Sequence, residues 1–183
     1  SQSLHEQASS SQVVIKQQLN TAQVNQLIEQ HTLEYVKQQP ALSTSLKLSN
    51  DYIANYNQQL PDYSPQGMKT LQQTMRKAAL ELANVELASL PDDTKLHLQV
   101  NRVIDNYYAG SEQFDAGYIE TWGGHLPYIV SQIAGPLMDI PKILENQQPV
   151  TNLAQANDYI TRLEALAAMV GQVHQKVEFD ANK

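Results

Sequence analysis

The chain has 183 residues, of which 42% are hydrophobic, and this is enough for one domain with a buried core. Its net charge of −7, from 12 basic and 19 acidic residues, argues against a nucleic-acid partner, because affinity for phosphate backbones comes largely from clustered Lys and Arg. Cysteine is absent, which excludes disulfides and thiolate sites, and no apolar run approaches the roughly 18 residues that span a bilayer.

The first 19 residues are rich in Ser and Gln, a composition typical of a flexible tether. We therefore expect a tether over residues 1–19 and a single helical domain over residues 20–183. A frayed terminus is the alternative explanation of the same composition.

Helical periodicity dominates the first half of the domain. Asn20 and Gln23 have the spacing of a capping box and predict a helix over about 21–39. Ser64-Pro65 predicts the start of a second helix, which we expect to end at Leu90 before a proline. The predicted core face of this second helix consists of Leu71, Met75, Ala79, Leu82 and Val85, broadened by Leu80 and Leu87.

A third helix is predicted from Asp93, as its cap, to Gly110. Its core-spaced positions are Leu96, Val100, Val103, Ile104 and Tyr107. After an irregular loop near 110–126, short helical segments are predicted over 127–133 and 137–145.

The last predicted helix begins at Thr151 or Asn152. Its apolar side consists of Ala156, Tyr159, Ile160, Leu163, Leu166, Ala167, Val170 and Val177. Taken together, the elements predict an all-α fold, an irregular multi-helix bundle of about five main helices.

The sequence contains no complete catalytic or metal-binding motif. Zinc peptidases place two histidines one helical turn apart with a glutamate beside the first, whereas the only His-Glu pair here, His5-Glu6, has no histidine four residues on. There is also no G-x-S-x-G elbow and no glycine-rich phosphate loop. We therefore expect no catalytic residue, no metal and no cofactor in this chain.

Residues 103–141 include five acidic residues and no Lys or Arg, together with several aromatic residues. Aromatic rings beside carboxylates on a glycine-hinged loop are suited to binding a cationic or peptidic group. The candidate substrate- or partner-binding residues are Tyr118, Glu120, Trp122, His125 and Tyr128. The alternative is that Tyr and Trp only pin an irregular loop to the core while the acidic residues are solvated.

Three segments carry a resemblance to a known family: LPYIVSQIAG at 126–135, PKIL at 141–144 and NDYITRL at 157–163. In this order they resemble a stretch of the large bacterial family called domain of unknown function 885. Residues 40–44 and 62–64 resemble the opening of that family's sequences, and the likeness extends over about residues 22–178.

Members of that family are similar to helical zinc metallopeptidases, and their His-Glu-x-x-x-x-His-type motif lies far downstream of the matching region. The resemblance therefore implies a non-catalytic amino-terminal lobe that shapes substrate access to a downstream active site, with zinc only in the parent protein. The implied partners are the remainder of the parent chain, another copy of this chain, or a peptide substrate. The alternative is a free-standing helical binding or scaffolding module without enzymatic activity.

Many members are lipoproteins or exported proteins, so the resemblance implies a periplasmic or outer-membrane-anchored location, with the cytoplasm as the alternative. Contact with a membrane would then involve only an N-terminal lipid anchor that has been removed. A lobe of a larger protein is expected to expose an apolar patch, here from the last helix and the 118–128 loop. The expected contributors from that helix are Leu163, Leu166, Val170 and Val173. Alternatively, the first and second helices cover that stripe.

Overall fold

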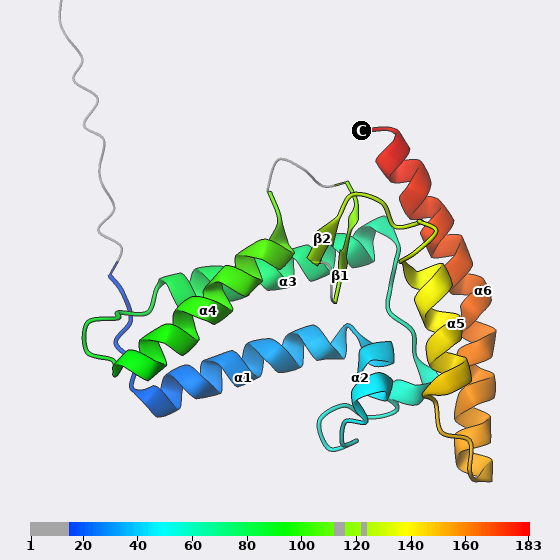
Figure 1. Ribbon diagram of the computed structural model, residues 1–183, viewed down its shortest axis with the longest axis horizontal. Helices are drawn as coiled ribbons and strands as arrows, with labels where there is room; N and C mark the ends of the chain where they lie inside the picture. The colour runs from blue at the N-terminus through cyan, green and yellow to red at the C-terminus, as the bar shows by residue number, and fades with distance from the viewer. Residues whose placement is uncertain (1–14, 112–115, 122–123) are drawn as a thin grey trace, which may run out of the picture.

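The computed structural model describes residues 15–111, 116–121 and 124–183, and this part of the chain is mainly helical (Figure 1). In chain order the elements are α1 (Thr21–Lys37), α2 (Pro40–Leu46), the 3-10 helix η1 (Tyr56–Gln58), α3 (Pro65–Ala83), α4 (Asp92–Ala109), β1 (Tyr118–Glu120), β2 (Gly124–Leu126), α5 (Pro136–Asn146) and α6 (Leu153–Ala181). The predicted all-α fold is confirmed, with a small antiparallel hairpin as an addition. The division at residue 19 stays a prediction, and residues 1–14 lie outside the described residues.

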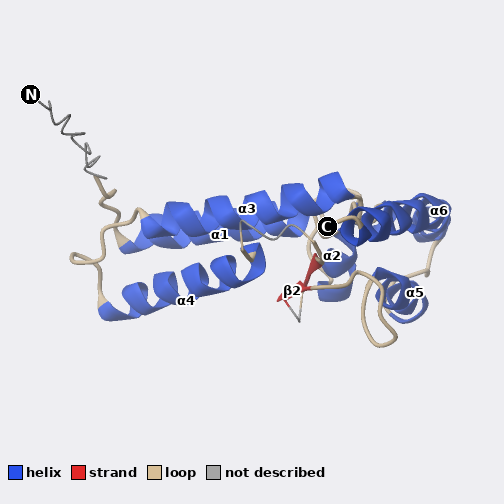
Figure 2. Ribbon diagram, turned by 90° about the horizontal axis from the view of Figure 1, so that it is seen from above, coloured by secondary structure: helices blue, strands red, loops and turns tan. Residues whose placement is uncertain are grey.

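The helices form two arms, which both views show (Figures 1 and 2). The long arm consists of α1, α3 and α4 lying side by side, and the short arm consists of α5 and α6, which run across its end. The helix α2 and the β1–β2 hairpin lie where the arms meet. The largest group of buried side chains occupies this junction, including Leu71, Met75, Tyr118, Ile140 and Met169.

Side chains cap three of the helices as their sequences predict. Asn20 accepts a hydrogen bond from the Gln23 amide at 2.9 Å, and the Gln23 side chain accepts one from the Asn20 amide in return. Ser64 accepts from the amide of Gly67, and Asn152 accepts from Gln155. These bonds satisfy backbone donors that the first turn of each helix leaves unpaired.

Two predicted helical segments were wrong. Helix α3 ends at Ala83 rather than Leu90. The backbone of Gln17 donates to the Asn84 carbonyl and accepts from the Glu86 amide, and these bonds hold the chain around Val85 in a strand-like pairing in place of a helix. Residues 127–133 contain no helix. They fold back so that the Ile129 carbonyl lies 2.4 Å from where a Cβ on Gly135 would be, and Gly135 has a φ of 116°, a conformation that favours glycine.

The predicted core face of α3 is confirmed, since Leu71, Met75, Ala79, Leu82 and Val85 are all buried. Leu80, which was expected to broaden it, is exposed instead. At the far end of the long arm, Leu82 and Val85 pack with Val24, Ile28 and Leu98 into a second buried cluster.

The predicted core face of α4 was wrong, and that of α6 was wrong in part, since Tyr159 and Leu166 do pack against the core. On α4 all five residues of the predicted core face are exposed, and we call them the α4 stripe: Leu96, Val100, Val103, Ile104 and Tyr107. On α6 they are Ile160, Leu163, Val170 and Val177, which we call the α6 stripe. The chain buries other positions instead, such as Leu98 on α4 and Met169 on α6. Of the patch expected on α6, Leu163 and Val170 are exposed, whereas the prediction for Val173 was wrong because it is buried against the core. Two apolar faces are therefore left on the surface, although none of the described helices is long and apolar enough to cross a membrane.

Helix α6 is joined to the junction by the fully buried side chain of Arg162. Its guanidinium donates to the carbonyls of Gln59 at 2.9 Å and Tyr56 at 2.5 Å. It also donates to the Thr44 hydroxyl at 2.9 Å and to the Gln148 side chain at 3.0 Å. One side chain thus connects α6 with α2, with η1 and with the loop that precedes α6.

A small group of titratable residues lies between the helices of the long arm. The His31 Nε2 atom of α1 is 2.7 Å from a carboxylate oxygen of Glu81 on α3, while no described group bonds its Nδ1 atom. On α4, Asp105 is buried near His31, and the loss of solvation raises the pKa of its carboxyl to about 6. Because the ordinary pKa of Asp is lower, its charged form costs folding free energy above this pH.

Replacing Asp105 with asparagine is expected to raise the free energy of unfolding by about 1–2 kcal/mol at pH 8. The substitution removes the cost of the buried charge, and one unit of pKa shift corresponds to about 1.4 kcal/mol. The buried amide also lacks a partner, which offsets part of this gain. The folded state binds the Asp105 proton more tightly than the unfolded chain does, so the contribution of Asp105 to stability falls as the pH rises from about 4 to 6. Urea unfolding at pH 4 and pH 8 measures this gain. The exposed Asp51→Asn variant is the control, and an equal effect of Asp105→Asn at both pH values would contradict the account.

Candidate functional site

The hairpin that carries most of the candidate residues is held at its tip by two tyrosines of the long arm. Strand β1 pairs with β2 so that Tyr118 faces Leu126 and Glu120 faces Gly124. Just after β1, the Thr121 hydroxyl lies 3.1 Å from the Tyr35 hydroxyl of α1, and the Tyr108 hydroxyl of α4 donates to the Thr121 carbonyl. The hairpin therefore has a fixed position relative to α1 and α4.

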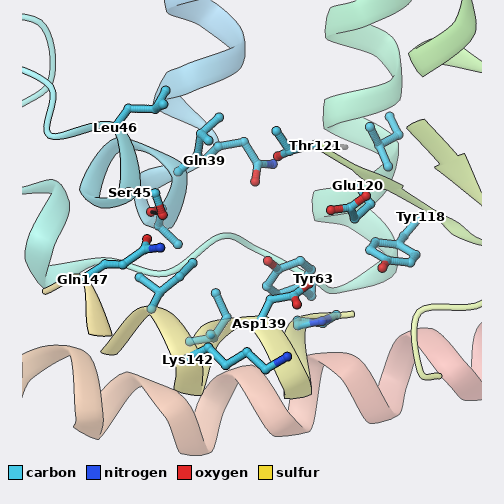
Figure 3. A pocket seen from close by; sticks show the side chains of 16 residues that line it. Gln39, Ser45, Leu46, Tyr63, Tyr118, Glu120, Thr121, Asp139, Lys142 and Gln147 are labelled. Atoms are coloured by element: carbon cyan, nitrogen blue, oxygen red, sulfur yellow. Dashed lines mark hydrogen bonds between the residues drawn. The ribbon is translucent and has the colours of Figure 1, made fainter. Parts of the chain in front are cut away.

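A pocket of about 440 Å³ lies between the region of α2, strand β1 and helix α5 (Figure 3). Glu120 of β1 and Gln39, just before α2, point into it from opposite sides. Tyr63 and Asp139 lie below them, and the Tyr118 hydroxyl points toward these two residues. The pocket thus combines two carboxylates with two phenol groups from distant parts of the chain.

Burial and negative charge both keep the phenols of this pocket protonated. Burial is the main cause that raises the pKa of Tyr118, and the nearby carboxylates of Glu120 and Asp139 raise it further. The pKa of Tyr63 is raised for the same reason, burial first, with Tyr118 and Asp139 adding to it. At neutral pH both hydroxyls therefore retain a proton and also offer oxygen lone pairs.

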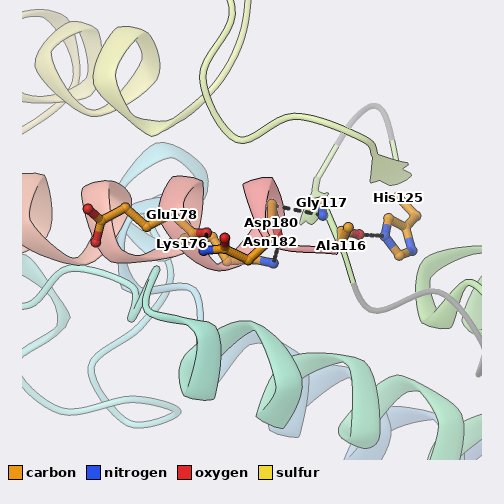
Figure 4. A network of polar contacts seen from close by, with 7 residues as sticks. All are labelled: Ala116, Gly117, His125, Lys176, Glu178, Asp180 and Asn182. Atoms are coloured by element: carbon orange, nitrogen blue, oxygen red, sulfur yellow. Dashed lines mark hydrogen bonds and ion pairs between the residues drawn. The ribbon is translucent and has the colours of Figure 1, made fainter.

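The base of the hairpin is attached to the end of α6 (Figure 4). A carboxylate oxygen of Asp180 accepts a hydrogen bond from the Gly117 amide at 3.0 Å, while its other oxygen is 2.5 Å from the ammonium of the buried Lys176. Beside this link, the His125 Nε2 atom lies 3.0 Å from the Ala116 carbonyl. Since a carbonyl only accepts, His125 carries its proton on Nε2.

The structure brings together only some of the candidate residues. Tyr118 and Glu120 lie on one face of β1 and line the pocket. His125 lines a second pocket near the end of α6, which Tyr118 also lines but Glu120 does not. Tyr128 is 74% exposed and lines neither pocket. Trp122 lies outside the described residues.

Sequence reasoning missed Tyr63, Gln39 and Lys142 as lining residues, and it noted Asp139 only as one of several acidic residues. These residues precede α2, precede α3 or lie on α5, so only the fold brings them to the hairpin. The tyrosines also give partial support to the alternative explanation, since Tyr35 and Tyr108 pin the hairpin.

The described residues do not fit a metal ion. In residues 15–111, 116–121 and 124–183, no group of three or more His, Asp or Glu side chains is arranged to hold one. His31 and His125, which each line a pocket, lie in different regions of the fold. Zinc chemistry is therefore not assigned to any described residue of this chain.

Comparison with known proteins identifies a matching family and a similar solved structure. Residues 40–183 match the family described as bacterial protein of unknown function (DUF885). The chain is also similar to the crystal structure of the putative lipoprotein from Colwellia psychrerythraea, with 33% sequence identity and a TM-score of 0.83. That similarity covers 88% of this chain but only 28% of the other, so the chain spans less than a third of that relative. None of the curated proteins matches the chain.

Proposed function

Because the chain belongs to the bacterial DUF885 family, we propose that it is the non-catalytic helical lobe of a larger zinc-metallopeptidase-like protein of the cell envelope. In this proposal the lobe packs against the remainder of the protein and shapes the access of substrates to an active site that the remainder provides. The name of the Colwellia psychrerythraea relative, a putative lipoprotein, supports the envelope location. Its much longer chain supports the existence of a remainder.

The observation that carries this proposal is the α4 stripe. Its five apolar side chains recur at helical spacing, from Leu96 to Tyr107, and Val103 is 68% exposed. A regular apolar face of this kind is normally buried against another element. Because a family relative has a chain several times longer, we assign the cover of this face to the remainder of the protein, and a second copy of the chain is the competing outcome.

The α6 stripe and the open pocket support the second half of the proposal. The α6 stripe lies on the short arm, whereas the α4 stripe lies on the long arm, so a remainder that contacts both would span the junction between the arms. The pocket beside the hairpin lies at this junction. Its position there supports a role in admitting or orienting a substrate.

Zinc and peptidase activity are expected to belong to the longer protein alone. The purified chain should retain no stoichiometric zinc and cleave no peptide, because a catalytic zinc needs three protein ligands and the described residues do not supply them. A longer DUF885 protein containing this region should retain zinc and cleave peptides. Elemental analysis and a peptide-cleavage assay on both proteins measure this, and one equivalent of tightly bound zinc on the chain alone would refute the non-catalytic assignment.

A further inference from the structure

The hydroxyl of Tyr118 lacks a partner in the described structure. The residue is only 3% exposed, and its Oη atom is almost fully buried and makes no hydrogen bond there. Buried polar atoms almost always have a partner, so an unpaired one requires an explanation. Figure 3 shows the hydroxyl pointing toward Asp139 and Tyr63 at the pocket.

The groups around this hydroxyl are predominantly hydrogen-bond acceptors. Glu120 and Asp139 are contributed by a strand and a helix, and both carboxylates are close enough to act electrostatically on Tyr118. One oxygen of Asp139 also accepts from the Gly135 amide at 3.3 Å, which leaves its other oxygen for a further donor. Lys142, one turn further along α5, is the cation among the lining residues and is exposed.

We propose that this pocket binds the primary ammonium group of a peptide between Glu120, Asp139 and the Tyr118 hydroxyl. An ammonium has three donors and no acceptor, which matches two carboxylates and one hydroxyl oxygen. Charge-assisted bonds of this kind are also stronger than neutral ones. The pocket volume of about 440 Å³ leaves room for the residue that bears the ammonium. The inference rests on the proposed function, for which it names the substrate class.

Both the α-ammonium of a peptide N-terminus and the side chain of lysine present this chemistry. Acetylation of the α-amine distinguishes them, because it removes the charge of the peptide N-terminus and leaves the charge of a lysine side chain in place. The test therefore uses three probes at pH 6.5: alanyl-alaninamide, its N-acetylated form and N-acetyl-lysinamide. Binding to the full chain is followed by NMR titration, using the amides of Tyr118 and Ile119.

We expect alanyl-alaninamide to bind and its acetylated form not to bind. Binding of N-acetyl-lysinamide as well would place the ammonium, rather than the peptide terminus, at the centre of recognition. Equal binding of the acetylated and free dipeptides would overturn the proposal, because the acetyl group removes the charge.

Variants at the two sides of the pocket test the sign of its charge preference. Glu120→Gln should weaken binding of the free dipeptide by about tenfold, because it removes one charge-assisted bond. Lys142→Gln should tighten binding about two- to threefold, because it removes a like charge. The exposed Glu145→Gln on the same helix, which does not line the pocket, should leave the affinity unchanged.

A weakening by Lys142→Gln would instead indicate an anionic ligand and overturn the proposal. Tyr118→Phe should weaken binding several-fold without lowering the melting temperature, since the hydroxyl it removes bonds no described group. All of these measurements use the chain alone. Their failure would leave the docking of the lobe untouched, and that docking is tested separately in a longer protein.

Discussion

Replacing Arg162 with leucine is expected to lower the free energy of unfolding by about 3–5 kcal/mol, the range typical of breaking a buried charged network. The guanidinium is fully buried and bonds carbonyl and side-chain oxygens on α2, η1 and the loop before α6. Leucine fills part of the volume but removes the donor to the Thr44 hydroxyl and to the Gln148 side-chain oxygen, and one of the two donors to the Tyr56 carbonyl. Urea unfolding followed by circular dichroism measures the change.

A lysine at this position should also destabilise the chain, by about 2 kcal/mol or more, because a single ammonium cannot reproduce the planar fork of donors. Burial lowers the pKa of Arg162 to about 10, so the native side chain stays charged at pH 7. Arg102→Leu, at an exposed position of α4, is the matched control and should change stability by less than about 0.5 kcal/mol. A change below 1 kcal/mol for Arg162→Leu would contradict this role.

Three helix starts could be predicted from the sequence because their signals are local, whereas α2 was not predicted and Asp93, the predicted cap of α4, makes no cap bond. Asn20, Ser64 and Asn152 each cap within three residues, so no knowledge of the fold is needed. The end of α3 could not be predicted in this way. It depends on the Gln17 backbone, which is far away in sequence but hydrogen-bonded to Asn84 and Glu86.

The core faces of α4 and α6 show a different limit of sequence reasoning. Apolar spacing reports that a face is to be buried, but it does not say what buries it. On α3 the partner lies within the chain, so the prediction for Leu71 and Leu82 was correct. On α4 the same reasoning selected Val103, which is exposed, in place of Leu98, which is buried.

The candidate site could be predicted only where aromatic and acidic residues lie close together in the sequence. Tyr118 and Glu120 were selected as aromatic and acidic residues of a predicted irregular loop, which was wrong for these residues because they form strand β1. The strand puts both side chains on one face, and this could not be predicted without it. His125 is paired with Ile119 in the hairpin, and it shares a pocket with Tyr118 but not with Glu120. Asp139 and Tyr63 reach the pocket only through the packing of α5 and of the segment before α3 at the junction.

The stability of two α4 variants, each measured in the chain alone and in a longer DUF885 protein, tests the central claim most directly. Leu98 is 1% exposed and Val103 is 68% exposed, although both lie on α4. Leu98→Ala should cost about 2–5 kcal/mol in both proteins, because it opens a cavity inside the long arm. It is therefore the positive control for folding in each context.

Val103→Ser should change the stability of the chain alone by less than about 0.5 kcal/mol, as expected at an exposed position. In the longer protein it should cost about 1–3 kcal/mol, because the α4 stripe would then be buried against the remainder and one hydroxyl would replace two packed methyl groups. Denaturant unfolding of the four variant proteins and their two parents gives these values. A cost that stays below 0.5 kcal/mol in the longer protein, with Leu98→Ala destabilising both, would show that the remainder does not cover this face and would contradict the lobe assignment.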